Sequence, residues 1–555
     1  MNGRLSGLRD CLPDAGQVRL ILAGAAGIFL GHPNPLVHLP LLALATPPAL
    51  FLLALRSASA RQALFLGWLT TLAGQTPALY WLILPITQIG GLPLPLALLC
   101  LLLLNAFLAL FAGLLCLIMR QAQRVFSSSP GIPSLSLPAA LAGGAAWSGC
   151  EILTGFLFTG FPWLVLNAAF APWPSWIQAA ALVGGYGLSA LYASGSCLLA
   201  CVRSGPNRLP VLGMGLALCL GPPLLGVLRL AESSAAAQNH PLTVLLIQGN
   251  IDQNQKWEPS FQWTAVGKYA SLSRQAIAQA TQRTEGVDLV LWPETAMPFA
   301  FQPQGSDTLS DALRNFSRSI NTPLAFGVLG VTGAGPQGRR FFNRAQFLSA
   351  SGEELGHYDK EHLVPFGEYI PLSANFDFLQ RILQGADFSP GRNAGSLLLP
   401  RTPLRQGNVS SAGGLERGDT ALGMLICYEA IFPELARQRV ADGAEVLVSI
   451  SNDAWFGATS APRQHLHLAA MRAVEQGRPL VRATNTGYTA VIDAFGRIVE
   501  ESQLFTEAVI TARVIPSSET TLYYKLHPFL RAGLPVCVLL LLLPFRFRRE
   551  GRNHS

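Results

Sequence analysis

Charged residues are scarce in this chain. Only 13% of its 555 residues are Asp, Glu, Lys or Arg, about half of the roughly 25% that is typical of globular domains. Half of the residues are hydrophobic, and the mean hydropathy is positive at +0.36. This balance excludes an ordinary soluble protein and predicts that a large part of the chain lies in a membrane.

Long apolar runs gather in the first part of the sequence, between residues 20 and 230, and several approach or exceed the roughly 20 residues that cross a bilayer. A last run, from Pro528 to Phe545, is interrupted only by Arg531, which lies close enough to one end to reach the membrane surface. We predict eight spans, at residues 20–31, 34–55, 62–84, 90–119, 135–158, 174–202, 209–230 and 528–545. The first could pass for the core of a signal peptide, but it lacks a convincing cleavage site and runs into the second.

Lysine and arginine are missing from every second short loop between these spans. The loops "HPNP", "PITQIGG" and "NAAFAPWP" have none, whereas the others carry Arg56 and Arg61, Arg120 and Arg124, and Arg203 and Arg208. Because basic loops stay in the cytoplasm, both termini are predicted to be cytoplasmic and residues 231–527 to lie outside, in the periplasm of a bacterial inner membrane. The net charge of +7 therefore reflects topology and does not indicate nucleic-acid binding.

Three parts follow from this pattern. We expect residues 1–230 to form a transmembrane domain of about seven helices, residues 241–515 a periplasmic domain, and residues 528–545 a C-terminal transmembrane helix. In the periplasmic domain, short apolar strands alternate with loops and amphipathic helices, which predicts an α/β sandwich built on mixed sheets. The expected strands and hairpins lie at 242–250, 287–294, 323–330, 345–360, 444–455, 479–487 and 490–501, the helices at 433–443 and 461–477, and a mobile loop at 401–418.

Cysteine is nearly absent from the periplasmic domain. Of nine cysteines, eight lie in or beside the predicted spans, and Cys427 is the remaining one. An unpaired thiol in an oxidising compartment is a liability unless it is buried or used. A buried core thiol is one interpretation, since free Cys is among the most buried residue types.

Three predicted strands end in groups that can do covalent chemistry: Glu294 after "VLWP", Lys360 after "HYD" and Cys427 after "MLI". A thiol near its usual pKa needs a base or a nearby cation to attack efficiently, and a carboxylate and an ammonium group can supply these. Each residue also has a structural interpretation, because Glu294 could begin a helix and Lys360 could end a solvated hairpin. Their joint occurrence favours a site.

Metal and phosphate sites are not indicated. His465 and His467 are two residues apart on a predicted helix and so do not share a face. "HYDKEH" lacks zinc-ligand spacing, and neither a P-loop nor a dinucleotide fingerprint occurs.

Four blocks of the sequence resemble the nitrilase (carbon–nitrogen hydrolase) superfamily: "LWPETA", "YDKEHLVPFGEYIP", "LICYEAIFPE" and "SNDAWFG". On a chain with apolar spans at both ends, together with "FPW" at 161–163 and "RATNTG" at 482–487, they resemble the apolipoprotein N-acyltransferase family. The resemblance covers essentially the whole chain. It implies that residues 241–515 form a nitrilase-like catalytic domain, an αββα sandwich outside the membrane.

The resemblance also implies roles. Glu294 would be the general base, Lys360 the oxyanion stabiliser and Cys427 the nucleophile, with Glu368 orienting Lys360 or the attacking group. The backbone N–H of Tyr428 would be an oxyanion donor. The positions that the family associates with lipid handling and support of the site are Trp257, Tyr428, Glu429 and Arg478, of which Trp257 and Arg478 are the weakest matches.

The implied reaction transfers a fatty acyl chain from a phospholipid, with phosphatidylethanolamine as the expected donor, to the amine of an S-diacylglyceryl-cysteine on a lipoprotein. It runs through a thioester on Cys427 and needs no cofactor or metal. A membrane-tethered amidase is an alternative within enzymes, but it gives no reason for so many spans. A transporter or scaffold with an inactive domain is another, and it is disfavoured because Glu294, Lys360 and Cys427, the implied catalytic triad, are all present.

Overall fold

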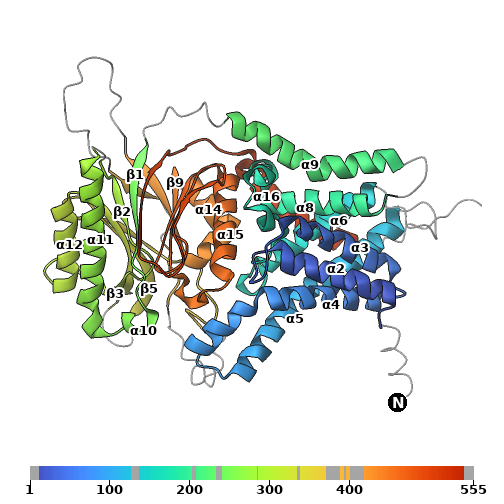
Figure 1. Ribbon diagram of the computed structural model, residues 1–555, viewed down its shortest axis with the longest axis horizontal. Coiled ribbons are helices and arrows are strands. Elements are labelled where there is room, and N and C mark those ends of the chain that lie inside the picture. Colours follow the sequence, from blue (N-terminus) through green and yellow to red (C-terminus); the bar gives the residue numbers. More distant parts are fainter. Residues whose placement is uncertain are drawn as a thin grey trace, which may run out of the picture.

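A helical part and a sheet-rich part lie side by side in the computed structural model (Figure 1). The structure describes residues 12–126, 137–202, 208–232, 241–283, 286–333, 338–370, 388–392, 396–400 and 418–542. The predicted loop at 401–418 lies outside these residues except at its last position.

The helical part is built from the apolar runs of the sequence. Its long helices are α2 (Ala15–Gly31), α3 (Thr46–Arg56), α4 (Ala60–Ala78), α5 (Leu94–Phe126), α6 (Leu137–Thr154), α8 (Ala180–Ala200), α9 (Arg208–Glu232) and α16 (Leu522–Leu542). Small residues let neighbouring backbones approach closely. A Cβ on Gly67 of α4 would lie 2.7 Å from the carbonyl oxygen of Ala112 in α5.

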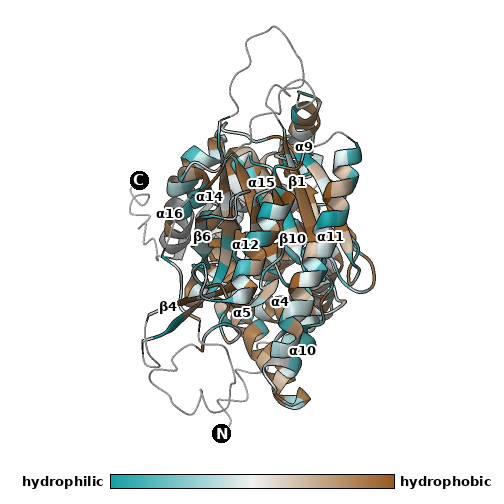
Figure 2. Ribbon diagram, turned by 90° about the vertical axis from the view of Figure 1, so that its left-hand side faces the viewer, coloured by the Kyte–Doolittle hydropathy of each residue, from teal (hydrophilic) through white to brown (hydrophobic). Residues whose placement is uncertain are grey.

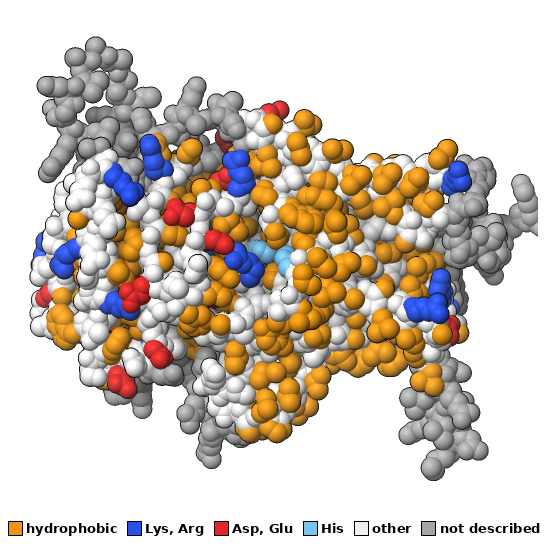
Figure 3. Space-filling model, in the orientation of Figure 1, with side chains coloured by type: hydrophobic (Ala, Val, Ile, Leu, Met, Phe, Trp, Pro, Cys, Tyr) orange, Lys and Arg blue, Asp and Glu red, His pale blue; other side chains and the backbone are white. Residues whose placement is uncertain are grey.

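Three helices in the described part of the chain are long and apolar enough to cross a membrane: Leu94–Gln123, Ala180–Ala200 and Arg208–Glu232. Shorter apolar helices occupy Ala15–Gly31 and Pro40–Arg56. Hydrophobic side chains cover the helical half of the molecule in Figure 3, and Lys and Arg appear at its far end. These features support a membrane domain, and the predicted count of eight spans stays a prediction.

Two mixed sheets form the other part. The first has the order β13-β1-β2-β4-β5-β6, with β3 paired to β4, and the second has the order β12-β11-β10-β9-β8-β7. Strands β1, β2 and β4 are parallel, as are β8, β9 and β10. The strands are β1 (Leu242–Gln248), β2 (Leu289–Leu291), β3 (Met297–Ala300), β4 (Leu324–Thr332), β5 (Arg340–Leu348), β6 (Glu354–Asp359), β7 (Leu397–Leu399), β8 (Thr420–Ile426), β9 (Val446–Ser451), β10 (Leu480–Thr484), β11 (Ala490–Ile492), β12 (Ile498–Glu501) and β13 (Ala508–Val514).

Helices cover the outer face of each sheet, so the layers run α-β-β-α (Figure 1). Helices α11 (Gln262–Gln282) and α12 (Thr308–Ile320) cover the first sheet, and α14 (Pro433–Ala441) and α15 (Ala461–Gln476) cover the second. Figure 2 shows α11 and α12 in front of mainly hydrophobic strands. Buried apolar side chains from both sheets pack between them, including Val244, Leu291, Met424 and Val448. The predicted αββα sandwich is confirmed.

Gln464, a buried side chain of helix α15, bonds to several segments of the helical part. Nε2 of Gln464 donates to the carbonyl oxygens of Pro33 (2.7 Å) and Ala78 (3.2 Å). Its Oε1 accepts from the indole N–H groups of Trp81 (3.0 Å) and Trp163 (2.7 Å). One glutamine of the sandwich thus bonds to three separate segments of the helical part, and Trp163 of the "FPW" motif is one of its partners.

Candidate active site

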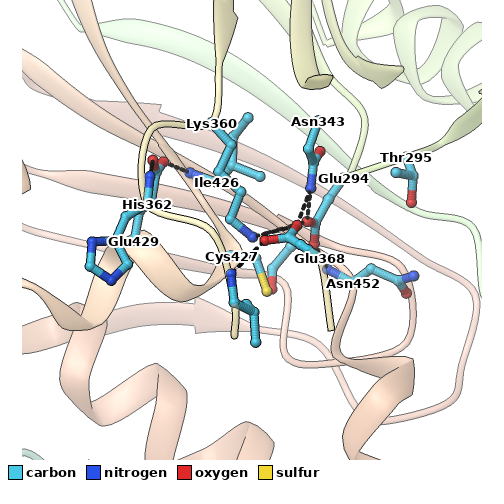
Figure 4. A network of polar contacts seen from close by, with 12 residues as sticks. Glu294, Thr295, Asn343, Lys360, His362, Glu368, Ile426, Cys427, Glu429 and Asn452 are labelled. Atoms are coloured by element: carbon cyan, nitrogen blue, oxygen red, sulfur yellow. Dashed lines mark hydrogen bonds and ion pairs between the residues drawn. The ribbon is translucent and has the colours of Figure 1, made fainter. Parts of the chain in front are cut away.

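The three reactive side chains of the sequence meet at one edge of the sandwich. Lys360 follows β6 directly, Cys427 follows β8 directly, and Glu294 comes three residues after β2. Figure 4 shows the sulfur of Cys427 pointing into a group formed by Lys360, Glu294 and Glu368. Carboxyl ends of strands from both sheets therefore bring together one thiol, one ammonium group and the carboxylate of Glu294, and the loop after β6 adds the carboxylate of Glu368.

Glu294 is held by a hydrogen bond to each carboxylate oxygen. Oε1 accepts from Nδ2 of Asn343 at 2.6 Å, and Oε2 accepts from the backbone N–H of Asn452 at 2.8 Å. The next residue, Thr295, has φ +47°, which is unfavourable for a β-branched side chain. This sharp turn lies against Gly327, where a Cβ would collide with the backbone nitrogen of Thr295. Contacts with β4, β5 and the end of β9 thus hold the carboxylate of Glu294 in one orientation.

Lys360 is buried between the two glutamates. Its Nζ lies 2.9 Å from Oε1 of Glu368 and 3.7 Å from Oε1 of Glu294. Burial by itself lowers the pKa of this lysine, but Glu368 and then Glu294 outweigh it, so its pKa is raised above the usual value. Lys360 therefore carries a permanent positive charge beside the thiol.

Cys427 has a strained backbone, with φ +52°, a conformation that costs free energy for any residue other than glycine and that often marks a functional site. Burial raises the pKa of its thiol and Glu294 raises it further, against the opposing charge of Lys360. The resting group is consequently a thiol. It needs a base to remove its proton as it attacks.

Glu368 contacts Lys360 and Asn343 through one carboxylate oxygen. Its Oε1 accepts from Nζ of Lys360 and from Nδ2 of Asn343 at 2.8 Å, and its Oε2 accepts from the backbone N–H of Val364 at 2.8 Å. Asn343 consequently bridges the two glutamates. The sequence interpretation missed Asn343, because a neutral residue inside a strand carries no local signature. Asn452 was also missed, although it lies in the quoted block "SNDAWFG".

Glu429 is fully buried and supports the loop after Lys360. Its Oε1 accepts from the hydroxyl of Tyr358 (2.8 Å) and from the backbone N–H groups of Glu361 (2.8 Å) and His362 (3.1 Å). Its Oε2 accepts from the N–H of Ile426 at 2.7 Å. The carboxylate thus ties the loop after β6 to the end of β8.

Tyr428 faces the membrane helices. Its hydroxyl donates to the carbonyl oxygen of Gly160 at 2.7 Å, and its ring stacks near that of Phe161 with 6.5 Å between centroids. The residue that follows Cys427 thereby contacts the segment that carries "FPW".

The structure does not bring Arg478 to the cluster. It precedes β10, at the edge opposite to the one where β8 ends in Cys427, and its guanidinium donates to the carbonyl oxygens of Ala444 (2.8 Å) and Glu519. Trp257 is 46% exposed. Its neighbour Lys256 is buried and donates from Nζ to Oγ1 of Thr295 at 2.7 Å, and burial lowers the pKa of Lys256 to about 7.

The arrangement can support acyl transfer through a covalent intermediate. It holds a nucleophile, a carboxylate able to accept its proton and a cation for the oxyanion of a tetrahedral intermediate. Within the described ranges, no group of three or more His, Cys, Asp or Glu side chains could hold a metal ion.

Comparisons with known proteins match both parts of the chain. The carbon-nitrogen hydrolase family model matches residues 243–524, and the model of the apolipoprotein N-acyltransferase N-terminal domain matches residues 25–198. The chain is 35% identical to the apolipoprotein N-acyltransferase of Geobacter metallireducens, over 98% of each chain. It is 34% identical to that of Azotobacter vinelandii, over 94% of each.

Among solved structures, an amidase of the nitrilase superfamily from Nesterenkonia is similar. It is 21% identical, covers 52% of this chain and 94% of its own, and has a TM-score of 0.35.

Proposed function

The chain belongs to the apolipoprotein N-acyltransferase family, and we propose that it transfers a fatty acyl chain from a phospholipid to a lipoprotein through a thioester on Cys427. The acceptor is the N-terminal amine of an S-diacylglyceryl-cysteine, and phosphatidylethanolamine is the donor. The observation that carries this proposal is the convergence of Cys427, Glu294 and Lys360 beside the membrane helices.

In the first half-reaction, Sγ of Cys427 attacks the ester carbonyl carbon of the phospholipid while Glu294 takes the thiol proton. The negative charge that develops on the carbonyl oxygen is stabilised by Lys360 and by the backbone N–H of Tyr428. The intermediate collapses by breaking the ester C–O bond. The lysophospholipid leaves with the proton from Glu294, and the acyl chain stays on Cys427 as a thioester.

In the second half-reaction, the amine of the acceptor attacks the thioester carbonyl. Glu294 takes a proton from the amine and returns one to the departing sulfur of Cys427, so the enzyme ends in its starting state. Both substrates are lipids, and withdrawing an acyl chain from the bilayer costs about 0.8 kcal/mol per CH₂ group. A site placed against membrane helices avoids that cost.

The site is proposed to lie on the periplasmic side of the inner membrane, with eight spans and the three parts predicted from the sequence. The Arg distribution of the loops supports this orientation. We expect a reporter fused near residue 400 to be exported, and reporters fused near Arg124 and after Arg552 to stay in the cytoplasm. A cytoplasmic reporter near residue 400 would contradict an odd number of preceding spans.

The function is tested by incubating the purified protein with phospholipid that carries a labelled acyl chain. We expect the label on Cys427, detected by mass spectrometry of the peptide, and its transfer to a diacylglyceryl-cysteine peptide that is added afterwards. Release of free fatty acid without transfer to the peptide would favour the membrane-tethered amidase. Absence of any labelled adduct would exclude covalent acyl transfer.

A further inference from the structure

The strained backbone of Cys427 is held by a residue outside the triad. His465 of α15 is fully buried, and its Nε2 lies 3.0 Å from the carbonyl oxygen of Cys427. A carbonyl oxygen can only accept a hydrogen bond, so Nε2 must carry the proton. This contact joins the helix next to the membrane domain to the residue whose φ of +52° aims the thiol.

The other ring nitrogen of His465 is fixed by an arginine. The Arg482 guanidinium lies 3.0 Å from Nδ1 of His465, and a guanidinium can only donate. Oδ1 of Asp453 lies 3.3 Å from the same nitrogen, a contact that would suit a protonated Nδ1. Burial lowers the pKa of His465, and the charge of Arg482 lowers it further, so the imidazole is neutral and its single proton is the one on Nε2. Nδ1 then accepts from Arg482.

Asp453 anchors this arginine. Arg482 lies 3.0 Å from Oδ1 and 2.9 Å from Oδ2 of Asp453, and the hydroxyl of Ser451 donates to Oδ1 at 2.7 Å. Burial alone would raise the pKa of Asp453, but Arg482 outweighs it and the pKa is lowered, so the pair stays ionised. A Cβ on Gly487, which ends the block "RATNTG", would collide with Oδ2 of Asp453. The close packing leaves Asp453 and Arg482 little room to shift.

We propose that His465 is a positioning residue for the nucleophile: its Nε2–H, oriented by Arg482 and Asp453, holds the carbonyl of Cys427 so that the thiol faces Glu294 and Lys360. The proposal deepens the proposed function and rests on Cys427 as the acylated residue. A displacement of about 1 Å at a reacting group can lower a rate on the order of 10²-fold. Loss of this one hydrogen bond should therefore slow thioester formation more than it weakens lipid binding.

Two substitutions separate positioning from a purely structural role. His465→Gln and His465→Asn both introduce an amide, but only the longer glutamine can place an N–H where Nε2 lies. We expect His465→Gln to form the thioester at close to the wild-type rate. We expect His465→Asn to lose on the order of 10²-fold in that rate, with little change in the phospholipid concentration for half-maximal rate. The assay is single-turnover thioester formation in detergent.

His467 supplies the matched control. It lies two residues further along α15, is buried, and packs its ring near that of His38 at 5.6 Å, with no hydrogen bond to Cys427 within the described part of the chain. His467→Gln and His467→Asn should differ little from each other. Equal rates for the two His465 variants, whether high or low, or a faster Asn variant, would overturn the proposal.

The rate at which iodoacetamide alkylates Cys427, measured by mass spectrometry, gives a second readout that does not require lipid. We expect slower alkylation in His465→Asn than in His465→Gln, because a displaced thiol loses the charge of Lys360. If the wild type forms no acyl adduct but the alkylation difference holds, the proposed function fails and the positioning role stands. If the adduct forms but neither measurement separates the two variants, only the positioning role fails.

Discussion

Cys427→Ala is expected to abolish both acyl-enzyme formation and transfer to the acceptor peptide while the protein stays folded. The substitution removes a single sulfur atom at the end of β8 and leaves the neighbouring hydrogen bonds of Glu429 to the backbone in place. Cys427→Ser should be almost as inactive, because a hydroxyl is a far weaker nucleophile than a thiol that is deprotonated as it attacks. The measurement is incorporation of labelled acyl chain from phospholipid.

Thermal unfolding in detergent is the control for both variants. The unfolding temperature of the Cys427→Ala protein should lie within a few degrees of that of the wild type. The substitution removes one atom and buries no new polar group, so it should lower the free energy of unfolding only a little. Turnover by a well-folded Cys427→Ala protein at a rate near that of the wild type would exclude covalent catalysis at this residue.

Glu294→Gln is expected to slow both half-reactions, because the same carboxylate takes the thiol proton in the first and the amine proton in the second. General-base assistance is worth about 10²–10⁴-fold, so a loss of that size is expected in each step. Both oxygens of Glu294 accept hydrogen bonds, from Asn343 and from the N–H of Asn452. The NH₂ group of a glutamine would face one of these two donors, so the orientation of the side chain at position 294 would change as well.

The two half-reactions can be read separately. Thioester formation is followed in a single turnover with labelled phospholipid, and a chase with diacylglyceryl-cysteine peptide follows the second step. Glu368→Gln is the matched comparison, since Glu368 contacts Lys360 and Asn343 in the same cluster and takes no proton in the proposed mechanism. If Glu294→Gln forms thioester at the wild-type rate while Glu368→Gln does not, Glu368 becomes the base.

Local pattern was sufficient to predict much of this molecule. The period of the apolar residues and the turn residues predicted strands at 242–250, 323–330 and 479–487 and a helix at 461–477. The structure has a strand or helix at each place, with ends that differ by up to three residues. The hairpin predicted at 345–360 is present as β5 and β6, and Gly352 between them has φ +75°. Such features depend on neighbours in the chain, so they are visible without the fold.

The reactive groups were also visible in the sequence, since Glu294, Lys360 and Cys427 each follow a strand within a block typical of the superfamily. Their partners were not. Asn343 lies 49 residues from Glu294, and His465 lies 38 residues from the Cys427 carbonyl that it holds. The residues next to Asn343 and next to His465 in the sequence do not indicate that these side chains contact Glu294 and Cys427.

The sequence by itself therefore determined that the chain has a membrane part and a sandwich part, and which strand ends carry a carboxylate, an ammonium group and a thiol. Only the tertiary structure decided which neutral side chains orient those groups, which nitrogen of His465 carries a proton, and that Arg478 lies at the opposite edge. The physical reason is that composition and periodicity act over a few residues, whereas a hydrogen bond between buried groups exists only after separate strands and helices have packed together.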